Sequence, residues 1–164
     1  MEFIQPRIRP FEDRDADAVV SLSLRAWAPV FESIEQAMGP GIFRRLYPEG
    51  WRESQQQSVE DVCAAEKIRV WVAEVDANTV GFVAVELHRE SSYGEIYMLA
   101  VDPEYQGGGI GTDLTEFALD RIQDAGMPVA MVETGADPGH AAARRTYDKA
   151  GYTQLPIARY FKEL

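Results

Sequence analysis

The stretch Glu95–Gly111 reads EIYMLAVDPEYQGGGIG, and it is the most informative part of the chain. Its first part, up to Val101, is rich in apolar and aromatic residues, which predicts a β-strand. The dipeptide Asp102-Pro103 then ends the strand, because proline has no N–H to donate to a sheet. After the glycines, apolar residues recur at helical spacing: Ile110, Leu114, Phe117, Ala118, Ile122 and Ala125. The stretch therefore predicts a strand, a glycine-rich turn and a helix in succession.

A glycine-rich turn in front of a helix favours anion binding. Glycines let backbone N–H groups converge at the helix N-terminus, where the helix dipole also attracts negative charge. The pattern is neither the G-x-G-x-x-G of dinucleotide-binding folds nor a Walker loop, since no Lys-Ser/Thr follows it. The alternative is a tight turn without a ligand. Three adjacent glycines disfavour it, because they cost conformational entropy that a simple turn does not require.

Composition and charge limit the possible functions of the chain. Its 164 residues, 46% hydrophobic and 26% charged, suit one domain spanning residues 1–164. No apolar run approaches membrane-spanning length, and the N-terminus lacks the pattern of a signal peptide. Cys63 is the single cysteine, so we expect no internal disulfide, no metal site and a cytoplasmic location. The net charge of −11 disfavours nucleic acid and anionic membranes as partners, and it is compatible with a cationic amine.

Periodicity and turn residues predict the remaining elements. We expect helices over residues 12–28, 51–66, 110–125 and 137–150, and strands over 7–11, 67–75, 80–89, 95–101, 129–134, 152–155 and 157–162. Short turns join the second to fourth strands, which predicts an antiparallel meander. The fourth and fifth strands flank a helix, which predicts a parallel crossover. Residues 29–66 are harder to assign, because prolines and glycines break their first part into short pieces. Their aromatic residues either line a binding pocket or pack together; packing is favoured.

Two motifs resemble the GNAT N-acetyltransferase superfamily. The first is Gln106-x-x-Gly109-x-Gly111 after Val101-Asp-Pro-Glu-Tyr, which is similar to that family's acetyl-coenzyme A signature. The second is the run A-x-x-x-Y-x-x-x-G-Y over residues 143–152. The resemblance covers residues 67–164, and 7–28 more loosely, whereas 29–66 carry no matching motif. It implies an α/β (α+β) fold with a mixed, mostly antiparallel sheet of six to seven strands and helices on both faces.

The resemblance also implies a cosubstrate and the residues that bind it. Acetyl-coenzyme A would be the acetyl donor, without a metal ion. The glycine turn would hold its diphosphate, and the preceding strand would lend its backbone to the pantetheine arm, with the Leu99 amide as oxyanion donor. The implied cofactor-binding residues are Leu99, Ala100, Val101, Gln106, Gly107, Gly108, Gly109, Ile110, Gly111, Thr112 and His140. His140 stands where many members have asparagine, and a surface histidine is the alternative.

Two catalytic residues follow from the same resemblance. Tyr147 matches the tyrosine that gives a proton to the leaving thiolate, and a phenol stays protonated at neutral pH; the alternative is a core tyrosine. Glu95 matches the position of a carboxylate that takes the amine proton, and the alternative is a solvated carboxylate at a strand end. His88, Glu86 and Glu133 are the other candidate bases. A symmetric hairpin would place Glu86 directly opposite Glu95, so we expect a coupled pair.

The sequence thus predicts an N-acetyltransferase that moves an acetyl group from acetyl-coenzyme A to a primary amine of a small molecule or peptide. Direct attack within a ternary complex is the expected mechanism, since Cys63 lies outside the motifs. The alternative is a non-catalytic acyl-coenzyme A binding or sensing domain, which would not need a proton donor at Tyr147. A homodimer is possible, because dimers are common in the resembled family.

Overall fold

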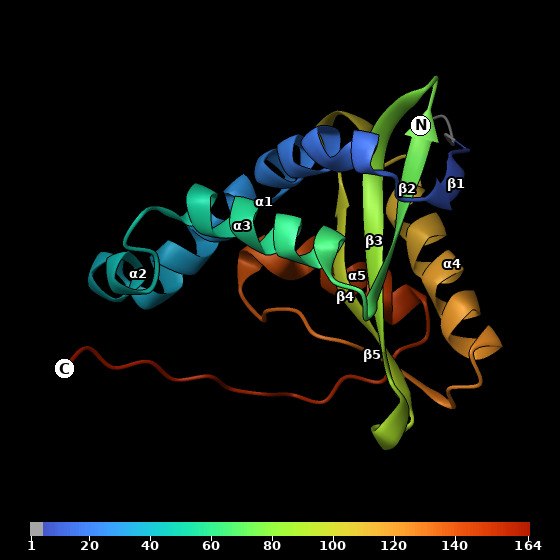
Figure 1. Ribbon diagram of the computed structural model, residues 1–164. Helices are drawn as coiled ribbons and strands as arrows, with labels where there is room; N and C mark the ends of the chain where they lie inside the picture. The colour runs from blue at the N-terminus through green and yellow to red at the C-terminus, as the bar shows by residue number, and fades with distance from the viewer. Residues whose placement is uncertain (1–4) are drawn as a thin grey trace.

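The computed structural model describes residues 5–164 as a five-stranded sheet with helices on both faces (Figure 1). The sheet order is β1-β2-β3-β4-β5. The strands are β1 (Arg7–Pro10), β2 (Ile68–Val75), β3 (Asn78–His88), β4 (Tyr93–Val101) and β5 (Val129–Val132). The helices are α1 (Ala16–Met38), α2 (Pro40–Leu46), α3 (Trp51–Ala64), α4 (Ile110–Asp124) and α5 (Ala141–Lys149). Within residues 5–164, no helix is long and apolar enough to cross a membrane.

The strand directions confirm the predicted meander and crossover. β2, β3 and β4 pair antiparallel, and β5 joins β4 in parallel after α4. Asp76 and Ala77 make the β2–β3 turn with φ of 48° and 64°, the left-handed geometry that tight hairpins require. A symmetric β3–β4 turn aligns Glu86 with Glu95, as the sequence predicts.

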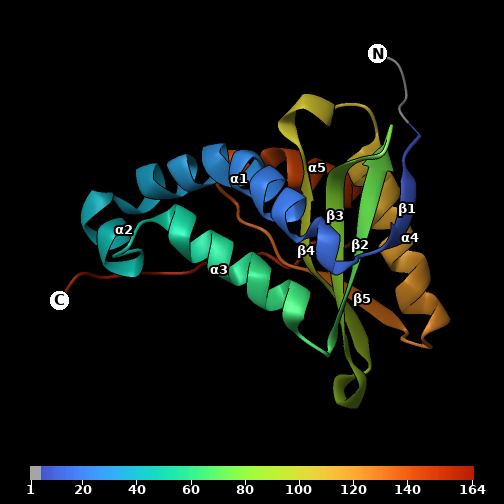
Figure 2. The ribbon, with the colours of Figure 1, turned by 45° about the horizontal axis from the view of Figure 1, so that its top comes forward.

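Helices cover both faces of the sheet (Figure 2), and an apolar layer on each face holds them to it. On one face, α1 and α3 cover Val72, Phe82 and neighbouring side chains of the sheet. On the other face, Leu114 and Ile122 of α4 pack on the alternate positions of the same strands. The central β3 is buried on both faces because its apolar residues are continuous rather than alternating.

The first helix is longer than predicted. The prediction ended it near Ala28, but α1 continues through Pro29 to Met38 and ends at Gly39, whose φ is 84°. Proline removes one helical hydrogen bond, yet packing beyond it compensates. Phe31 is buried and stacks on Trp51 with ring centroids 4.6 Å apart.

The aromatic residues between α1 and α3 pack together, as the favoured alternative predicts. Phe31 and Phe43 both contact the ring of Tyr47, at centroid distances of 5.4 and 4.9 Å. These contacts join α1, α2 and α3 into an arm that extends beyond the sheet (Figure 1).

The predicted strands over residues 152–155 and 157–162 are wrong. The segment after α5 is extended but belongs to no strand, so the sheet has five strands instead of six to seven. Its side chains are exposed from Thr153 onward, and Pro156 has no backbone N–H to donate to a sheet. β-propensity alone forms no strand where no neighbouring strand supplies hydrogen bonds.

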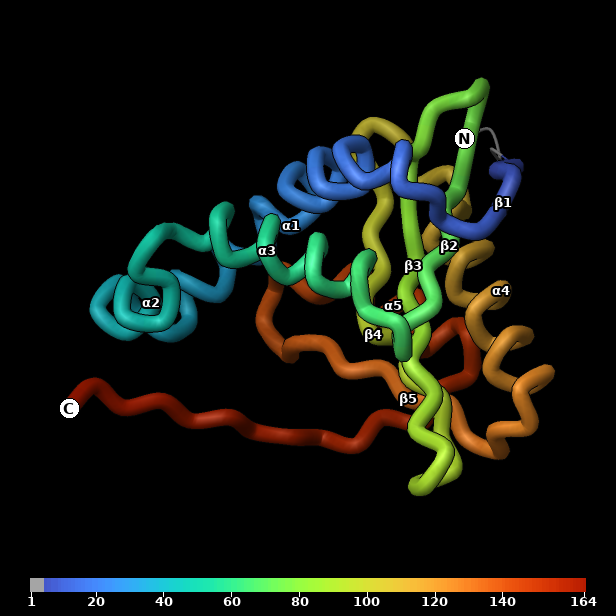
Figure 3. Tube along the Cα trace, viewed as in Figure 1, coloured from blue at the N-terminus to red at the C-terminus, as the bar shows by residue number. Residues whose placement is uncertain are grey.

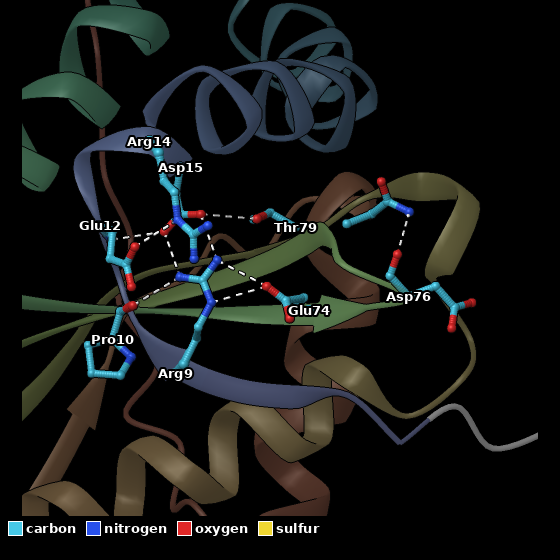
Figure 4. Close-up of polar contacts among 9 residues, drawn as sticks. Arg9, Pro10, Glu12, Arg14, Asp15, Glu74, Asp76 and Thr79 are labelled. Carbon is cyan, nitrogen blue, oxygen red and sulfur yellow. Dashed lines mark hydrogen bonds and ion pairs between the residues drawn. The ribbon is translucent and has the colours of Figure 1, made fainter.

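A buried ion-pair network, called here the N-terminal cluster, joins Arg9, Asp15 and Glu74 (Figure 4). Both terminal nitrogens of Arg9 donate to Asp15 at 2.8 Å, and its Nε donates to Glu74 at 3.1 Å. The guanidinium hydrogen bond lowers the pKa of Asp15 below its usual value. Through these hydrogen bonds, Arg9 links β1 to Glu74 of β2 and to Asp15, which directly precedes α1.

Candidate active site

A cleft of about 1030 Å³ opens where β4 and β5 separate. β5 pairs with β4 only from Tyr93 to Ile96, and the β3–β4 register then skips Tyr97, which marks a bulge. A bulge bends its strand and increases the local twist. The rest of β4, the glycine turn, residues 132–134 and parts of α1 and α5 line the cleft.

The glycine turn presents free backbone donors at one end of the cleft. Gly107 and Gly109 have φ of 81° and 94°, which residues with a side chain rarely adopt. Gly109 is the N-cap of α4, and among the described residues no side chain caps the helix, so the amides of Gly109, Ile110, Gly111 and Thr112 have no partner within it. The Gln106 side chain instead donates to the Val101 carbonyl at 3.0 Å and holds the turn against β4.

Most predicted coenzyme-binding residues line this cleft. They are Leu99, Ala100, Val101, Gln106, Gly107, Gly108, Gly109, Gly111, Thr112 and His140. Ile110 is not among the lining residues: its side chain is 1% exposed and packs in the α4 core. Only the Ile110 backbone amide remains a candidate ligand.

Tyr147 lines the cleft from α5 and contacts the ring of Tyr152 edge-on at 5.7 Å. Burial raises the pKa of Tyr147 to about 12. Its hydroxyl is therefore protonated at neutral pH, as a proton donor must be.

His140 also lines the cleft, and a hydrogen-bond network fixes its ring. Its Nδ1 lies 2.5 Å from Asp137 Oδ1, and Ser33 Oγ donates to Asp137 Oδ2 at 2.6 Å. Burial alone would raise the pKa of Asp137, but the hydrogen bonds from Ser33 and His140 outweigh it and lower that pKa. The ring nitrogen left for a ligand is Nε2.

Glu95 lies outside the cleft lining, in a second charged cluster, called here the β4 cluster. Glu95 Oε2 is 2.7 Å from His88 Nε2, and Lys67 Nζ is 2.7 Å from the Glu86 carboxylate. Hydrogen bonding to Glu86 raises the pKa of Lys67, with smaller contributions from the nearby Tyr97 and Glu95. Tyr97 itself lines the cleft, so the β4 cluster borders the cleft through this residue.

The β4 cluster also has the chemistry of a cation site. Glu86, His88 and Glu95 each offer one possible ligand atom, and these three atoms lie within 4.8 Å of one another. Carboxylate and imidazole ligands suit divalent metals. The cation that the structure places there is the Lys67 ammonium, which already pairs with the buried Glu86.

The sequence interpretation missed three aromatic lining residues. Trp27 reaches the cleft from α1, while Tyr97 and Tyr105 lie on either side of the β4 end. Tyr97 follows the predicted base by two positions and lies at the bulge in β4. Glu133, a candidate base, does line the cleft, where Arg159 approaches it to 3.5 Å.

Cys63 is not among the lining residues of this cleft. It is half-buried on α3, and burial raises the pKa of its thiol to about 11. The thiolate, which is the reactive form, is therefore scarce at neutral pH.

The chain matches one protein-family model and resembles several curated proteins over about half of its length. The model of the acetyltransferase (GNAT) family matches residues 40–152. The chain is 37% identical over 82 residues to the mycothiol acetyltransferase of Streptomyces coelicolor, and 39% over 83 residues to that of Streptomyces griseus. These alignments cover 50% and 51% of this chain, but only 26% of each relative.

Comparison with solved structures shows the same fold. The aminoglycoside N-acetyltransferase AAC(6')-Iy in complex with CoA superposes with a TM-score of 0.67 at 11% identity, covering 97% of this chain and 95% of that one. The ribosomal-protein-S18-alanine N-acetyltransferase from Escherichia coli gives 0.68 at 21% identity, with coverages of 94% and 82%. Since the family model spans more than half of the chain and includes both motifs, the protein belongs to the GNAT acetyltransferase family.

Proposed function

We propose that the chain is an N-acetyltransferase that moves an acetyl group from acetyl-coenzyme A to a primary amine of a small molecule or peptide. The observation that carries this proposal is one cleft with free amides of the α4 first turn at one part and the protonated Tyr147 at another. A ligand that carries both an anionic group and a reacting thioester would need the amides for its anion and a proton donor near its thioester.

The residues present fit the coenzyme. Gly107 and Gly109 have the positive φ angles that this turn requires. A Cβ on Gly111 would lie 3.8 Å from the side chain of Val101. When bound, acetyl-coenzyme A would supply the activated acetyl thioester. The amides of Gly109, Gly111 and Thr112 would bind its diphosphate, and the backbone of residues 99–101 would bind the pantetheine arm. His140, held by Asp137, would add a ring N–H or acceptor at Nε2.

The chain's own groups would move the two protons of the reaction. Tyr147 would donate its hydroxyl proton to the departing sulfur. Glu95 would take a proton from the acceptor ammonium, directly or through water, to give the neutral amine that attacks the thioester, with His88 hydrogen-bonded beside it. Direct attack on the thioester fits the high pKa of the Cys63 thiol, which disfavours an acetyl-cysteine route.

The acceptor is proposed to be a small, cationic amine. The net charge of −11 favours a cation over nucleic acid or an anionic membrane. The names of the relatives point to small molecules, mycothiol in one group and aminoglycosides in the other. We also propose a cytoplasmic location and a homodimer.

The test is thiol release from acetyl-coenzyme A with small amines, polyamines, aminoglycosides and peptide N-termini. Amine-dependent release, with the acetylated product detected by mass spectrometry, is expected. Tight coenzyme binding without turnover on any of these amines would instead support a binding or sensing domain.

A further inference from the structure

Ser33 lies on α1 beyond Pro29 and outside residues 40–152, which the family model matches. Its Oγ donates to Asp137 Oδ2 at 2.6 Å and accepts from the Gly139 amide at 3.0 Å. The chain that follows β5 runs across to α1 before α5 begins, so these bonds join two distant parts of the sequence (Figure 3). Both parts contribute lining residues to the cleft. Ser33 therefore connects two elements that surround the candidate site.

The loop between β5 and α5 is closely packed against Ser33. A Cβ on Gly139 would lie 2.6 Å from the Ser33 Cβ, and a Cβ on Gly135 would lie 2.5 Å from His140 Nδ1. Any side chain at these two positions would require its neighbours to move, so both suit glycine. From α5, Arg144 donates to two carbonyls of the same loop, at 2.6 and 2.8 Å. The helices α1 and α5 thus both hold the loop in place.

The two carboxylate oxygens of Asp137 have separate partners. Oδ2 accepts from Ser33 and from the Gly139 amide, whereas Oδ1 lies 2.5 Å from the Nδ1 of His140. Burial raises the pKa of Asp137, but the hydrogen bonds from Ser33 and His140 lower it by more, so the carboxylate is ionised at neutral pH. An ionised carboxylate only accepts hydrogen bonds, so the proton lies on Nδ1. The neutral ring then has a bare Nε2, which is an acceptor.

We propose that Ser33 is a positioning residue of the coenzyme site. By holding Asp137, it keeps His140 in the tautomer whose Nε2 accepts a hydrogen bond from an N–H group of the bound coenzyme. The pantetheine arm of acetyl-coenzyme A carries amide N–H groups of this kind. This role rests on the coenzyme site proposed above, where the His140 ring could otherwise either donate or accept.

The place of His140 along α5 favours the pantetheine arm over the reacting thioester. His140 directly precedes α5, and Tyr147 lies about two helical turns further on, or about 10 Å along the helix axis. Both residues line the cleft. With the thioester beside Tyr147, as its proposed role requires, His140 would contact another part of the same ligand. The Asp137–His140 pair therefore serves binding, although such a pair can act as a general base elsewhere.

The first test is the affinity for coenzyme A, measured by isothermal titration calorimetry on the full chain. Ser33→Ala should weaken binding about tenfold, because the loss of this hydrogen bond frees Asp137 and lets the His140 ring change its tautomer. Ser21→Ala, at an exposed position on the same helix and outside the cleft lining, is the matched control and should keep full affinity. Circular dichroism checks that both variants are folded. Equal affinity in Ser33→Ala would overturn the proposal.

A double-mutant cycle separates this role from a general effect on the fold. His140→Ala removes the ring and should itself weaken coenzyme binding. Adding Ser33→Ala to His140→Ala should cost no further affinity, because Ser33 acts through the ring. A full additional loss in the double variant would mean that Ser33 only supports the fold, and would refute its role in the site.

The tautomer can be measured without any turnover. The chain has two histidines, so nitrogen NMR reports on both imidazole rings, and His140→Ala assigns the signals. At a pH where the ring is neutral, we expect a proton on Nδ1 of His140 and none on Nε2. Adding coenzyme A should shift the Nε2 resonance, and Ser33→Ala should increase the fraction of rings protonated on Nε2. A ring protonated mainly on Nε2 in the unaltered free protein would overturn the proposal.

The same measurements distinguish failure of this role from failure of the proposed function. Tight coenzyme binding that depends on Ser33, without amine-dependent thiol release, would refute the proposed transferase and support the role of Ser33. Acetylation of amines with equal coenzyme affinity in Ser33→Ala would refute the role of Ser33 alone. A protein that binds no coenzyme A would refute both.

Discussion

The N-terminal cluster and the cleft are both polar, but they differ in how completely their groups are paired. In the N-terminal cluster, Arg9 pairs directly with Asp15 and Glu74 (Figure 4). The side chains of Arg9 and Asp15 are 11% and 5% exposed. In the cleft, no side chain of residues 5–164 caps the α4 first turn, and Tyr147 is one of the lining residues.

This difference separates stability from function. A closed network stabilises the fold, because removing one member leaves a buried charge without a partner. An open set of donors contributes little to stability and is available to a ligand. The β4 cluster is intermediate: Glu86 is buried, but its partner Lys67 is 74% exposed on its side chain and can be displaced. Four substitutions test this contrast, taken from the largest expected effect to the smallest.

Arg9→Met should lower the free energy of unfolding by about 3 kcal/mol, because it leaves Asp15 and Glu74 unpaired. The coenzyme-dependent activity of the folded fraction should be unchanged. Urea unfolding monitored by circular dichroism measures the loss. Arg14→Met is the matched control, since the exposed Arg14–Glu12 pair should contribute less than about 1 kcal/mol.

The same variant should alter the pH dependence of stability. Arg9 lowers the pKa of Asp15, so its contribution is fully present above the pKa of an unfolded aspartate, about 3.9. The contribution decreases as the pH falls through that value toward the lower folded pKa. Between about pH 5 and 3, the free energy of unfolding should therefore decrease less in Arg9→Met than in the unaltered protein. Parallel curves for both proteins would mean that the ion pair is not the source of the stabilisation.

Gly109→Val should remove coenzyme binding while the free protein stays folded. Valine disfavours the φ of 94°, so the first-turn amides should lose their arrangement. Coenzyme A at 100 times its dissociation constant should stabilise the unaltered protein by about 2.7 kcal/mol. Thermal unfolding with and without coenzyme measures this shift. An undiminished shift in Gly109→Val would contradict the diphosphate site. Gly126→Val is the control, since Gly126 also has a positive φ, 80°, but is not among the cleft-lining residues.

Tyr147→Phe should lower kcat about 10²-fold or more with little change in coenzyme affinity, since only the hydroxyl is lost. The buried ring and its contact with Tyr152 should be retained. Steady-state kinetics and a coenzyme titration of the same preparation separate the two effects. Equal kcat values would show that the hydroxyl is structural and that water supplies the proton.

Glu95→Gln should have the smallest effect, a decrease of about tenfold in kcat/KM, because His88 and Glu86 remain close enough to accept the proton. Measuring kcat/KM against pH should show a changed acid limb. The matched control is Glu90→Gln, an exposed carboxylate in the same hairpin turn. An unchanged rate and profile would move the base to Glu133, which lines the cleft.

Local signals in the sequence predicted much of the site. Proline and glycine placed the end of β4 and the start of α4, and the helical spacing placed Tyr147 near the C-terminus of α5. The Glu86–Glu95 pairing was also predictable, since a symmetric turn sets the register and the Tyr97 bulge lies beyond the pair. The Lys67 partner of Glu86 was not, because it comes from the neighbouring β2 end.

The sequence by itself determined the strand–glycine turn–helix unit, because periodicity, proline and glycine act through the backbone of adjacent residues. Only the tertiary structure decided which residues share the cleft and which segments become strands. Val30 lines the cleft from α1 because this helix continues past Pro29, where packing of Phe31 outweighs a missing hydrogen bond. Residues 157–162 have strand-forming side chains but form no strand, because within the described residues they pair with no neighbouring strand, and a sheet requires such hydrogen bonds.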